Sequence, residues 1–447
     1  MNAFALRAAA LVLPAYVALL PLQRLGLPVF GHRFSAADAV LSVAFLVYLP
    51  GTVRGWAEGE RAMDAAALRL GAGLAAFICA AALSIAASRA PGIGMVSLVP
   101  YLYAAGLVLL FARLVVLAPA DFDRRLHETV AASLGLLAVG AIIPASFAPS
   151  WTTVAFDTSD KAVYAKYMFL LEGPTQLSVL AVMYFAILAL LRAEGRARGV
   201  ISDVLAPAAF ANILLLNGSR IAPLSGILLL IVFWGVLFKE VLGAAPSNRR
   251  ARVLILSLSL GLTAFVGAYQ LDGPRTLTAY RSLSGVQSLI VRMFPFLNDR
   301  LMEHFSAHEH LQEAYLLREV IDDLASSCFV DRPALGIGLG QFVGNYGMRE
   351  VHNTLLGVAA EMGIAGLIGL GLIFAELVRT VWLAWLGVRF QALARALILL
   401  AVLLPHWVHF LLRERWVWLF FLVFVFAPTD RTRQTKDSRR DVAGSRA

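Results

Sequence analysis

A histidine at the head of an apolar segment is the side chain best suited to acid–base chemistry in this sequence. His352 precedes Asn353, and a hydrophobic run then continues through Glu361 and Gly363 as a predicted helix. A neutral imidazole can accept a proton from a hydroxyl group at neutral pH, so we predict that His352 is a general base. Asn353 would cap the helix. The alternative is an interfacial histidine that only anchors the helix.

A glycine-rich stretch lies shortly before this histidine. It reads Pro333-Ala334-Leu335-Gly336-Ile337-Gly338-Leu339-Gly340-Gln341-Phe342. As a dinucleotide fingerprint it is weak, because the third glycine is not at the required spacing and no βαβ unit surrounds it. We therefore predict a tight turn that returns a polar loop to the membrane.

One isolated arginine could bind an anion at a helix start. Arg220 closes the turn Asn217-Gly218-Ser219-Arg220 between two apolar runs. A guanidinium there would add to the unpaired N–H groups and the positive dipole end of the next helix. The alternative is an arginine that snorkels to the interface.

The polar loop before the histidine carries further arginines. They are Arg275, Arg281, Arg292, Arg300, Arg318, Arg332 and Arg349. If residues 277–294 form a helix, Arg281 and Arg292 share a face, because they are about three turns apart. Together such arginines could hold a diphosphate through charge-assisted contacts, whereas each one alone could be a solvated surface charge.

Neither a metal site nor a nucleotide site has a convincing pattern. His304, His308 and His310 lie near glutamates, but they form no H-E-x-x-H arrangement and have no obvious completing ligand. A Walker A sequence is also missing. We expect no metal, no cofactor and no nucleic-acid partner.

The composition places these residues in a membrane protein. Of 447 residues, 60% are hydrophobic and only 15% are charged, which is too apolar for a soluble chain. Windows of about 20 apolar residues predict twelve transmembrane helices and an all-α polytopic fold. The predicted spans are 3–22, 35–53, 64–87, 95–117, 126–148, 174–192, 200–218, 220–242, 251–270, 353–378, 392–411 and 414–428, the last one short.

The loop charges predict an orientation. Most lysines and arginines of the short connections fall in the even-numbered ones and in the basic tail, which places both termini in the cytoplasm. By parity, Arg220 and the large loop, which we expect to be helical, share the opposite, periplasmic face. The predicted regions are 1–270 with nine helices, the periplasmic loop 271–352, 353–428 with three helices, and the cytoplasmic tail 429–447.

Three groups of residues resemble one known family. The glycine-rich stretch is similar to a P-L-L-G-x-G-x-x-x-F turn. His352-Asn353-Thr354-Leu355-Leu356 with Glu361-Met362-Gly363-Ile364-Ala365-Gly366 is similar to H-N-x-x-L…E-x-G-x-x-G, and Ser219-Arg220 to an upstream S-R. These motifs resemble the O-antigen ligase and O-antigen polymerase superfamily of bacterial membrane glycosyltransferases, over roughly 214–375.

The resemblance implies a glycosyltransferase C-type fold in the bacterial inner membrane, with membrane lipids around it. It implies transfer of a glycan from undecaprenyl diphosphate at the periplasmic face, without a metal or a nucleotide. His352 matches the family histidine and Arg220 the family arginine. Arg281 and Arg300, then Arg318, are the preferred further diphosphate ligands. Direct displacement would invert the anomeric centre, because no carboxylate is placed as a nucleophile.

Several functions stay open at this point. Ligase members use lipid A-core as the acceptor, and polymerase members use a lipid-linked glycan. The sequence has no Arg-x10-Gly element of the kind described for some polymerases, which favours a ligase or an exopolysaccharide-type relative. A secondary transporter or lipid flippase would need charges and broken helices at mid-membrane. A non-catalytic scaffold is the third alternative.

Overall fold

The chain folds mainly into helices, which we describe from a computed structural model. The described residues are 3–29, 32–57, 65–117, 121–147, 153–158, 162–167, 174–216, 222–272, 310–346, 351, 353–407 and 412–425. The helices are α1 (Ala3–Leu19), η1 (Leu20–Leu25), α2 (Ala36–Ala57), α3 (Ala65–Ala86), α4 (Pro91–Leu117), α5 (Phe122–Phe147), α6 (Pro174–Ala193), α7 (Val200–Leu216), α8 (Ala222–Leu242), α9 (Pro246–Asp272), α12 (His310–Asp331), α13 (Gln341–Tyr346), α14 (Thr354–Gly387), α15 (Arg389–Leu403), η3 (Leu404–Trp407) and α16 (Arg415–Val425).

Each predicted span falls on one of these helices. Among the described residues, six helices are long and apolar enough to cross a membrane, namely α3, α4, α6, α8, α9 and α14. The predicted class of a helical membrane protein is confirmed at this level. Exposed apolar side chains support a membrane location. Leu254, Leu258 and Phe265 on α9 are all exposed, and exposure of such a row of apolar side chains to water would be unfavourable.

Two short hairpins add strands that the all-α prediction omits. Strand β1 (Leu27–Val29) pairs antiparallel with β2 (His32–Phe34), and β3 (Thr153–Thr158) pairs antiparallel with β4 (Ala162–Tyr167). In the second hairpin Thr153 is opposite Tyr167 and Thr158 is opposite Ala162. Both hairpins lie in connections between helices, so they leave the helical class unchanged.

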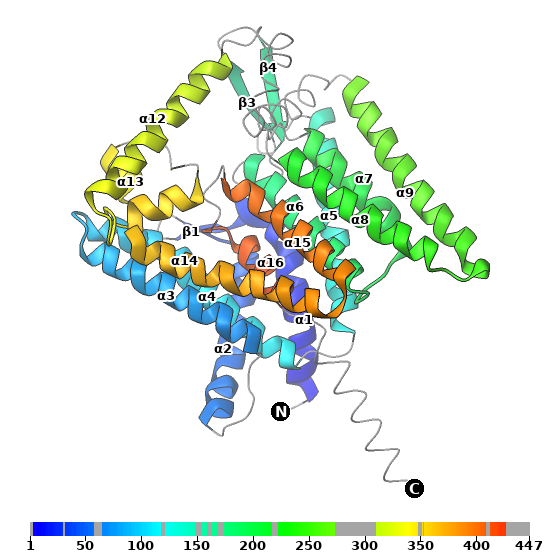
Figure 1. Ribbon diagram of the computed structural model, residues 1–447, viewed down its shortest axis with the longest axis horizontal. Coiled ribbons are helices and arrows are strands. Elements are labelled where there is room, and N and C mark those ends of the chain that lie inside the picture. The colour runs from blue at the N-terminus through cyan, green and yellow to red at the C-terminus, as the bar shows by residue number, and fades with distance from the viewer. Residues whose placement is uncertain are drawn as a thin grey trace.

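Helix α6 is the centre of the fold (Figure 1). It contacts α5, α7, α8, α15 and α16, and every residue from Leu177 to Leu191 is buried. A helix that is apolar on all sides needs such surroundings. Most of its neighbours therefore bury one face against α6 and leave the other face to the outside.

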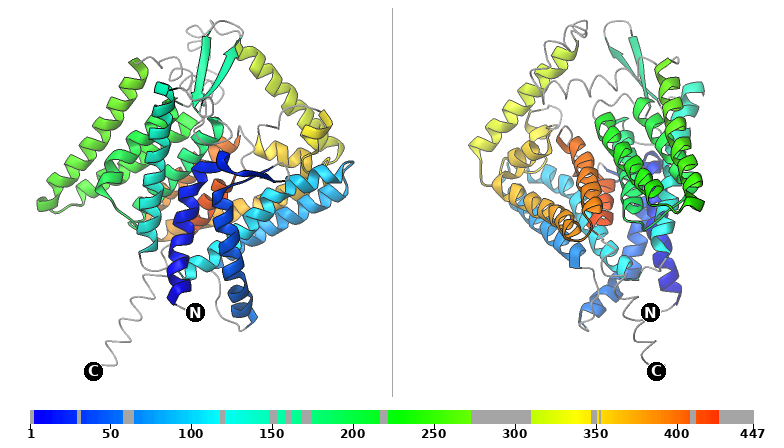
Figure 2. Two further views of the ribbon diagram at one scale, coloured as in Figure 1. Left: turned by 180° about the vertical axis from the view of Figure 1, so that it is seen from behind. Right: turned by 45° about the vertical axis from the view of Figure 1, so that its right-hand side comes forward.

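Helices α3, α4 and α14 form a second group and run side by side (Figures 1 and 2). Glycines allow α3 and α14 to approach closely. A Cβ atom on Gly369 would stand 2.6 Å from Cα of Phe77, and one on Gly73 would stand 3.0 Å from the backbone nitrogen of Ile373. Small residues are the usual means of close helix packing in lipid, where the hydrophobic effect does not drive helices together.

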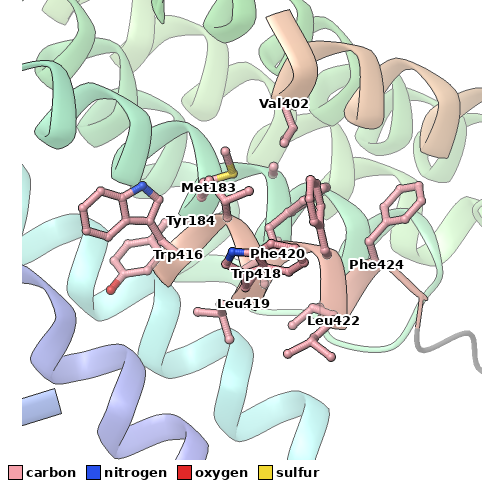
Figure 3. Packing of buried hydrophobic residues seen from close by; sticks show 14 of the residues in the cluster. Met183, Tyr184, Val402, Trp416, Trp418, Leu419, Phe420, Leu422 and Phe424 are labelled. Carbon is pink, nitrogen blue, oxygen red and sulfur yellow. The ribbon is translucent and has the colours of Figure 1, made fainter. Parts of the chain in front are cut away.

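The last helix is buried inside the bundle. From Trp416 to Val425 every side chain of α16 is at most 2% exposed. Figure 3 shows these aromatic residues beside Met183 and Tyr184 of α6 and Val402 of α15. Eleven residues extend about 16 Å as an α-helix, which is shorter than the hydrocarbon core of a bilayer. The described part of the short twelfth span is thus a core helix.

Candidate functional site

Most of the predicted site residues lie outside the described residues. This applies to Arg220, Arg281, Arg300 and His352, and to the predicted helix 277–294. Arg318 lies on α12, one helical turn before the buried Ile321, although the position of its side chain is not described. The candidate site is therefore built from the described segments on either side of His352.

The glycine-rich stretch forms a tight turn, which we call the Gly turn (residues 332–342). Gly336, Gly338 and Gly340 have φ angles of 66°, 115° and 74°. Residues with a Cβ atom rarely adopt such angles, because the side chain approaches the backbone too closely. The predicted turn is confirmed, and it ends at α13 with a hydrogen bond from Gln341 Nε2 to the carbonyl of Ala90 (2.7 Å).

The Gly turn packs against a break in α14, where we predicted a continuous helix through Glu361 and Gly363. That prediction is wrong at Gly363, whose φ and ψ angles are 62° and −155°. Four backbone hydrogen bonds join the two segments: Ile337 N–H to Ala360 O (2.9 Å), Gly338 N–H to Glu361 O (3.0 Å), Ile364 N–H to Pro333 O (2.8 Å) and Ala365 N–H to Ala334 O (3.2 Å).

These four bonds explain why the helix can break. An unpaired backbone group is costly away from water, so irregular backbone at membrane depth must be paired within the protein. The glycines also allow the two backbones to touch. A Cβ atom on Gly363 would stand 2.5 Å from the carbonyl carbon of Ala334, and one on Gly336 would stand 2.5 Å from the nitrogen of Met362.

Both chain neighbours of His352 have fixed positions. Val351 is 4% exposed and packs with Ile321, Phe342 and Ala360 in a small second core under α12. Asn353 is the N-cap of α14, and its side-chain oxygen accepts hydrogen bonds from the N–H groups of Leu355 (2.9 Å) and Leu356 (3.2 Å). The predicted cap is confirmed.

A carboxylate lies at the break itself. The Oε1 atom of Glu361 accepts a hydrogen bond from the N–H of Phe342 (3.4 Å), and its Oε2 atom is 3.6 Å from Nη2 of Arg413. Ser84 donates a hydrogen bond to the carbonyl of Glu361 (2.6 Å). Glu361 is buried, so the partial neutralisation by Arg413 lowers the cost of placing a charge there.

A second arginine stands two residues further along the chain. Arg415 contacts Asp38 at 2.6 Å and Ser35 at 3.2 Å, and its guanidinium lies 5.2 Å from the ring centre of Tyr103. The hydroxyl group of Tyr103 is 3.5 Å from that of Tyr16. This cation is therefore held by an ion pair and an aromatic face.

The sequence prediction missed these two arginines because it placed Arg415 inside the span 414–428 and Arg413 in the short connection before it. A usable signal was present, since Arg413, Glu414 and Arg415 are three consecutive charges at the head of that span. Charged residues there need partners in neighbouring helices. Glu414 has such a partner in Gln176, whose Nε2 atom donates a hydrogen bond to Oε1 of Glu414 (3.1 Å).

Polar contacts divide the helix ends into two sets at opposite ends of α6. The Gly-turn end joins the starts of α2, α6, α14 and α16 with the α3–α4 connection. The Arg192 end joins the ends of α6 and α8 with the starts of α5, α7, α9 and α15. The predicted spans cross the membrane in alternating directions, and this alternation places the same helix ends together on each side. Which end faces the cytoplasm stays a prediction.

Comparisons with known proteins give no further information. No protein-family model, no curated protein and no solved structure matches this chain.

Proposed function

We propose that this protein is a glycosyltransferase that moves a glycan from undecaprenyl diphosphate to a sugar hydroxyl on the periplasmic face. The proposal takes its chemistry from the motif resemblance. One structural observation supports it most: the Gly turn packs on the α14 break, and Val351 and Asn353 are held beside it. In this proposal the fold has twelve spans of the glycosyltransferase C type, with both termini in the cytoplasm of a bacterial inner-membrane protein.

The reaction assigns a role to each predicted residue. His352 accepts the proton of the acceptor hydroxyl while its oxygen attacks the anomeric carbon and the bond to the diphosphate breaks. The displacement inverts the anomeric centre and uses no metal. Cations bind the diphosphate and stabilise the charge that develops on it as it leaves. The proposed ligands are Arg220, Arg281, Arg300 and Arg318.

Arg413 and Arg415 place two guanidinium groups at the same end of α6 as the Gly turn. Each is already paired, with Glu361 and with Asp38 respectively. Such an arginine is positioned before the substrate arrives, so its charge needs no reorganisation during the reaction. We therefore assign them an electrostatic role beside the diphosphate.

Lipid A-core is the proposed acceptor, which makes the protein ligase-like, with polymerisation onto a lipid-linked glycan as the alternative. Cell-surface glycans of a deletion strain separate the two. Lipid-linked chains with bare core indicate a ligase, whereas loss of long chains with single repeats retained indicates a polymerase.

Two substitutions test the proposal in that strain. His352→Ala and Arg220→Ala should each abolish detectable glycan transfer at normal expression. Removal of a general base costs about 10²–10⁴-fold in rate, and loss of Arg220 removes a cation that stabilises the leaving diphosphate. Arg249→Ala is the control, because Arg249 is exposed at the Arg192 end. Normal transfer by both site variants would rule out the proposal.

A transporter or lipid flippase is the second candidate, and the break in α14 favours it. Discontinuous helices with paired charges often form transport sites. Here, however, the break is filled by the Gly turn, and Glu361 contacts Arg413. Uptake into liposomes that depends on an ion gradient, and that persists in His352→Ala, would favour transport over transfer.

A further inference from the structure

A cavity opens at the Arg192 end of α6, away from the Gly turn. Its volume is about 380 Å³, which is in the range of small-ligand sites. The walls come from the end of α6, the end of α8 and the starts of α9 and α15. Its charged lining residues are Arg192, Glu194, Arg198, Lys239, Glu240 and Arg252.

The charged residues that line the cavity keep an excess of positive charge when the residues that pair with them are counted. It contains four cationic side chains and two carboxylates. One carboxylate, Glu194, is also neutralised from outside the lining by Arg395 and by Arg196 at 3.1 Å. Burial would lower the pKa of Arg196, but the charge of Glu194 and the hydrogen bond with Asp123 outweigh it and raise that pKa. Asp203, also outside the lining, pairs with Arg192. The lining and these ion-paired partners together hold six cations against four carboxylates, so an excess of positive charge remains.

The floor of the cavity offers hydrogen-bond donors. Arg192 is 5% exposed, and its Nη2 atom contacts Asp203 (3.0 Å) and Glu240 (2.8 Å). Its Nε and Nη1 atoms have no hydrogen-bond partner among the residues that the structure describes. Buried donors are nearly always paired, so these two atoms leave the Arg192 charge only partly compensated beside the cavity.

The rim continues into an apolar face. Lys239 is exposed and stands 3.8 Å from the ring centre of Phe390, while the Arg198 side chain is 57% exposed. On the same helix as Lys239, Phe238 is 53% and Leu242 is 63% exposed. Because these two are four residues apart, they share a helix face. Cations at a cavity mouth and apolar side chains beside it match a phospholipid, with a phosphate head and an acyl chain.

We propose that this cavity binds a phosphate-bearing anion, supplied by the headgroup of an anionic phospholipid. Basic pockets between transmembrane helices are suited to such headgroups. The phosphate would contact Arg198 and Lys239 at the rim, attracted also by the charge of Arg192 beneath them, while one acyl chain follows α8 past Phe238 and Leu242. This site is independent of the proposed glycan transfer.

The test compares two double variants of the full-length protein in mild detergent. Arg198→Gln with Lys239→Gln removes the rim charges. Arg249→Gln with Arg250→Gln removes two exposed charges that do not line the cavity. Binding of phosphatidylglycerol, phosphatidylcholine and inorganic phosphate is measured by native mass spectrometry. All four residues are exposed, so both variants should fold, which thermal unfolding checks.

We expect the wild type to retain phosphatidylglycerol over phosphatidylcholine. The rim variant should bind phosphatidylglycerol more weakly by about fivefold for each charge removed, and the control variant should change less than twofold. Selective binding of inorganic phosphate that is lost in the rim variant supports the anion site and assigns it to free phosphate. Equal losses in both variants, or no preference for phosphatidylglycerol or phosphate, would overturn the proposal.

Discussion

The two ends of α6 accommodate polar groups beside apolar helices in different ways. At the Gly-turn end, four backbone hydrogen bonds pair the break in α14 with the Gly turn, and two separate ion pairs stand near it. At the Arg192 end the polar groups are mostly side chains, joined into a network of carboxylates and arginines. Gln176 and Arg192 mark the two ends, about 24 Å apart along the helix.

This difference predicts the kind of substitution to which each end is most sensitive. Backbone pairing depends on conformation, so the Gly-turn end should be sensitive to an added Cβ atom. An ion network depends on charge balance, so the Arg192 end should be sensitive to the loss of one partner. Three predictions test this contrast, in addition to the substitutions already proposed.

The largest effect should come from Arg192→Gln. Its side chain is 6% exposed, and its loss leaves Asp203 and Glu240 with one cation fewer. Breaking a buried ion pair by removing one partner costs about 3–5 kcal/mol in the free energy of unfolding. Denaturant unfolding in detergent measures it. The control is Arg198→Gln, which removes an exposed partner of the same Glu240 and should cost at most about 1 kcal/mol. Equal losses would contradict the network interpretation.

Gly363→Ala should follow, with a loss of about 3 kcal/mol. The reason is conformational, because residues with side chains are strained at this backbone geometry. The matched control is Gly371→Ala, eight residues further along the same helix, where an added Cβ atom meets nothing within 4 Å. That control should change stability by at most about 1 kcal/mol, in the stabilising direction. If both variants unfold at the same temperature, the break does not depend on glycine.

The smallest effect should come from Asn353→Ala. Loss of the N-cap hydrogen bonds to Leu355 and Leu356 costs about 1 kcal/mol. Asn353→Ser keeps a capping oxygen and should recover most of the stability. Because Asn353 is next to His352, glycan transfer should fall in the alanine variant and recover in the serine variant. Full transfer by the alanine variant would mean that the cap does not position the site.

Local features were predictable from the sequence because short stretches encode them. Each predicted span coincides with a helix, and the turn at Gly336, Gly338 and Gly340 has the positive φ angles that its glycines allow. Asn353 caps the helix where it was expected to. The sequence pattern missed both hairpins, which are short and lie in connections between strongly apolar segments.

The break at Gly363 and the pairing of Arg413 and Arg415 could not be read from local patterns. The apolar run continues through Gly363, so hydropathy predicts an unbroken helix there. The break is stable only because residues 333–338, about 30 positions earlier, supply its missing hydrogen-bond partners. Arg415 likewise depends on Asp38, at the other end of the chain.

The helical membrane class, the places of the helices, and the turn and cap beside His352 can all be derived from the sequence alone. Those properties follow from hydrophobicity over about 20 residues and from the conformations that glycine and asparagine allow. The place where α14 breaks, the pairing of arginines with carboxylates and the position of the cavity at Arg192 depend on tertiary contacts. The reason is that a hydrogen bond or an ion pair needs two partners, and here they lie far apart in the chain.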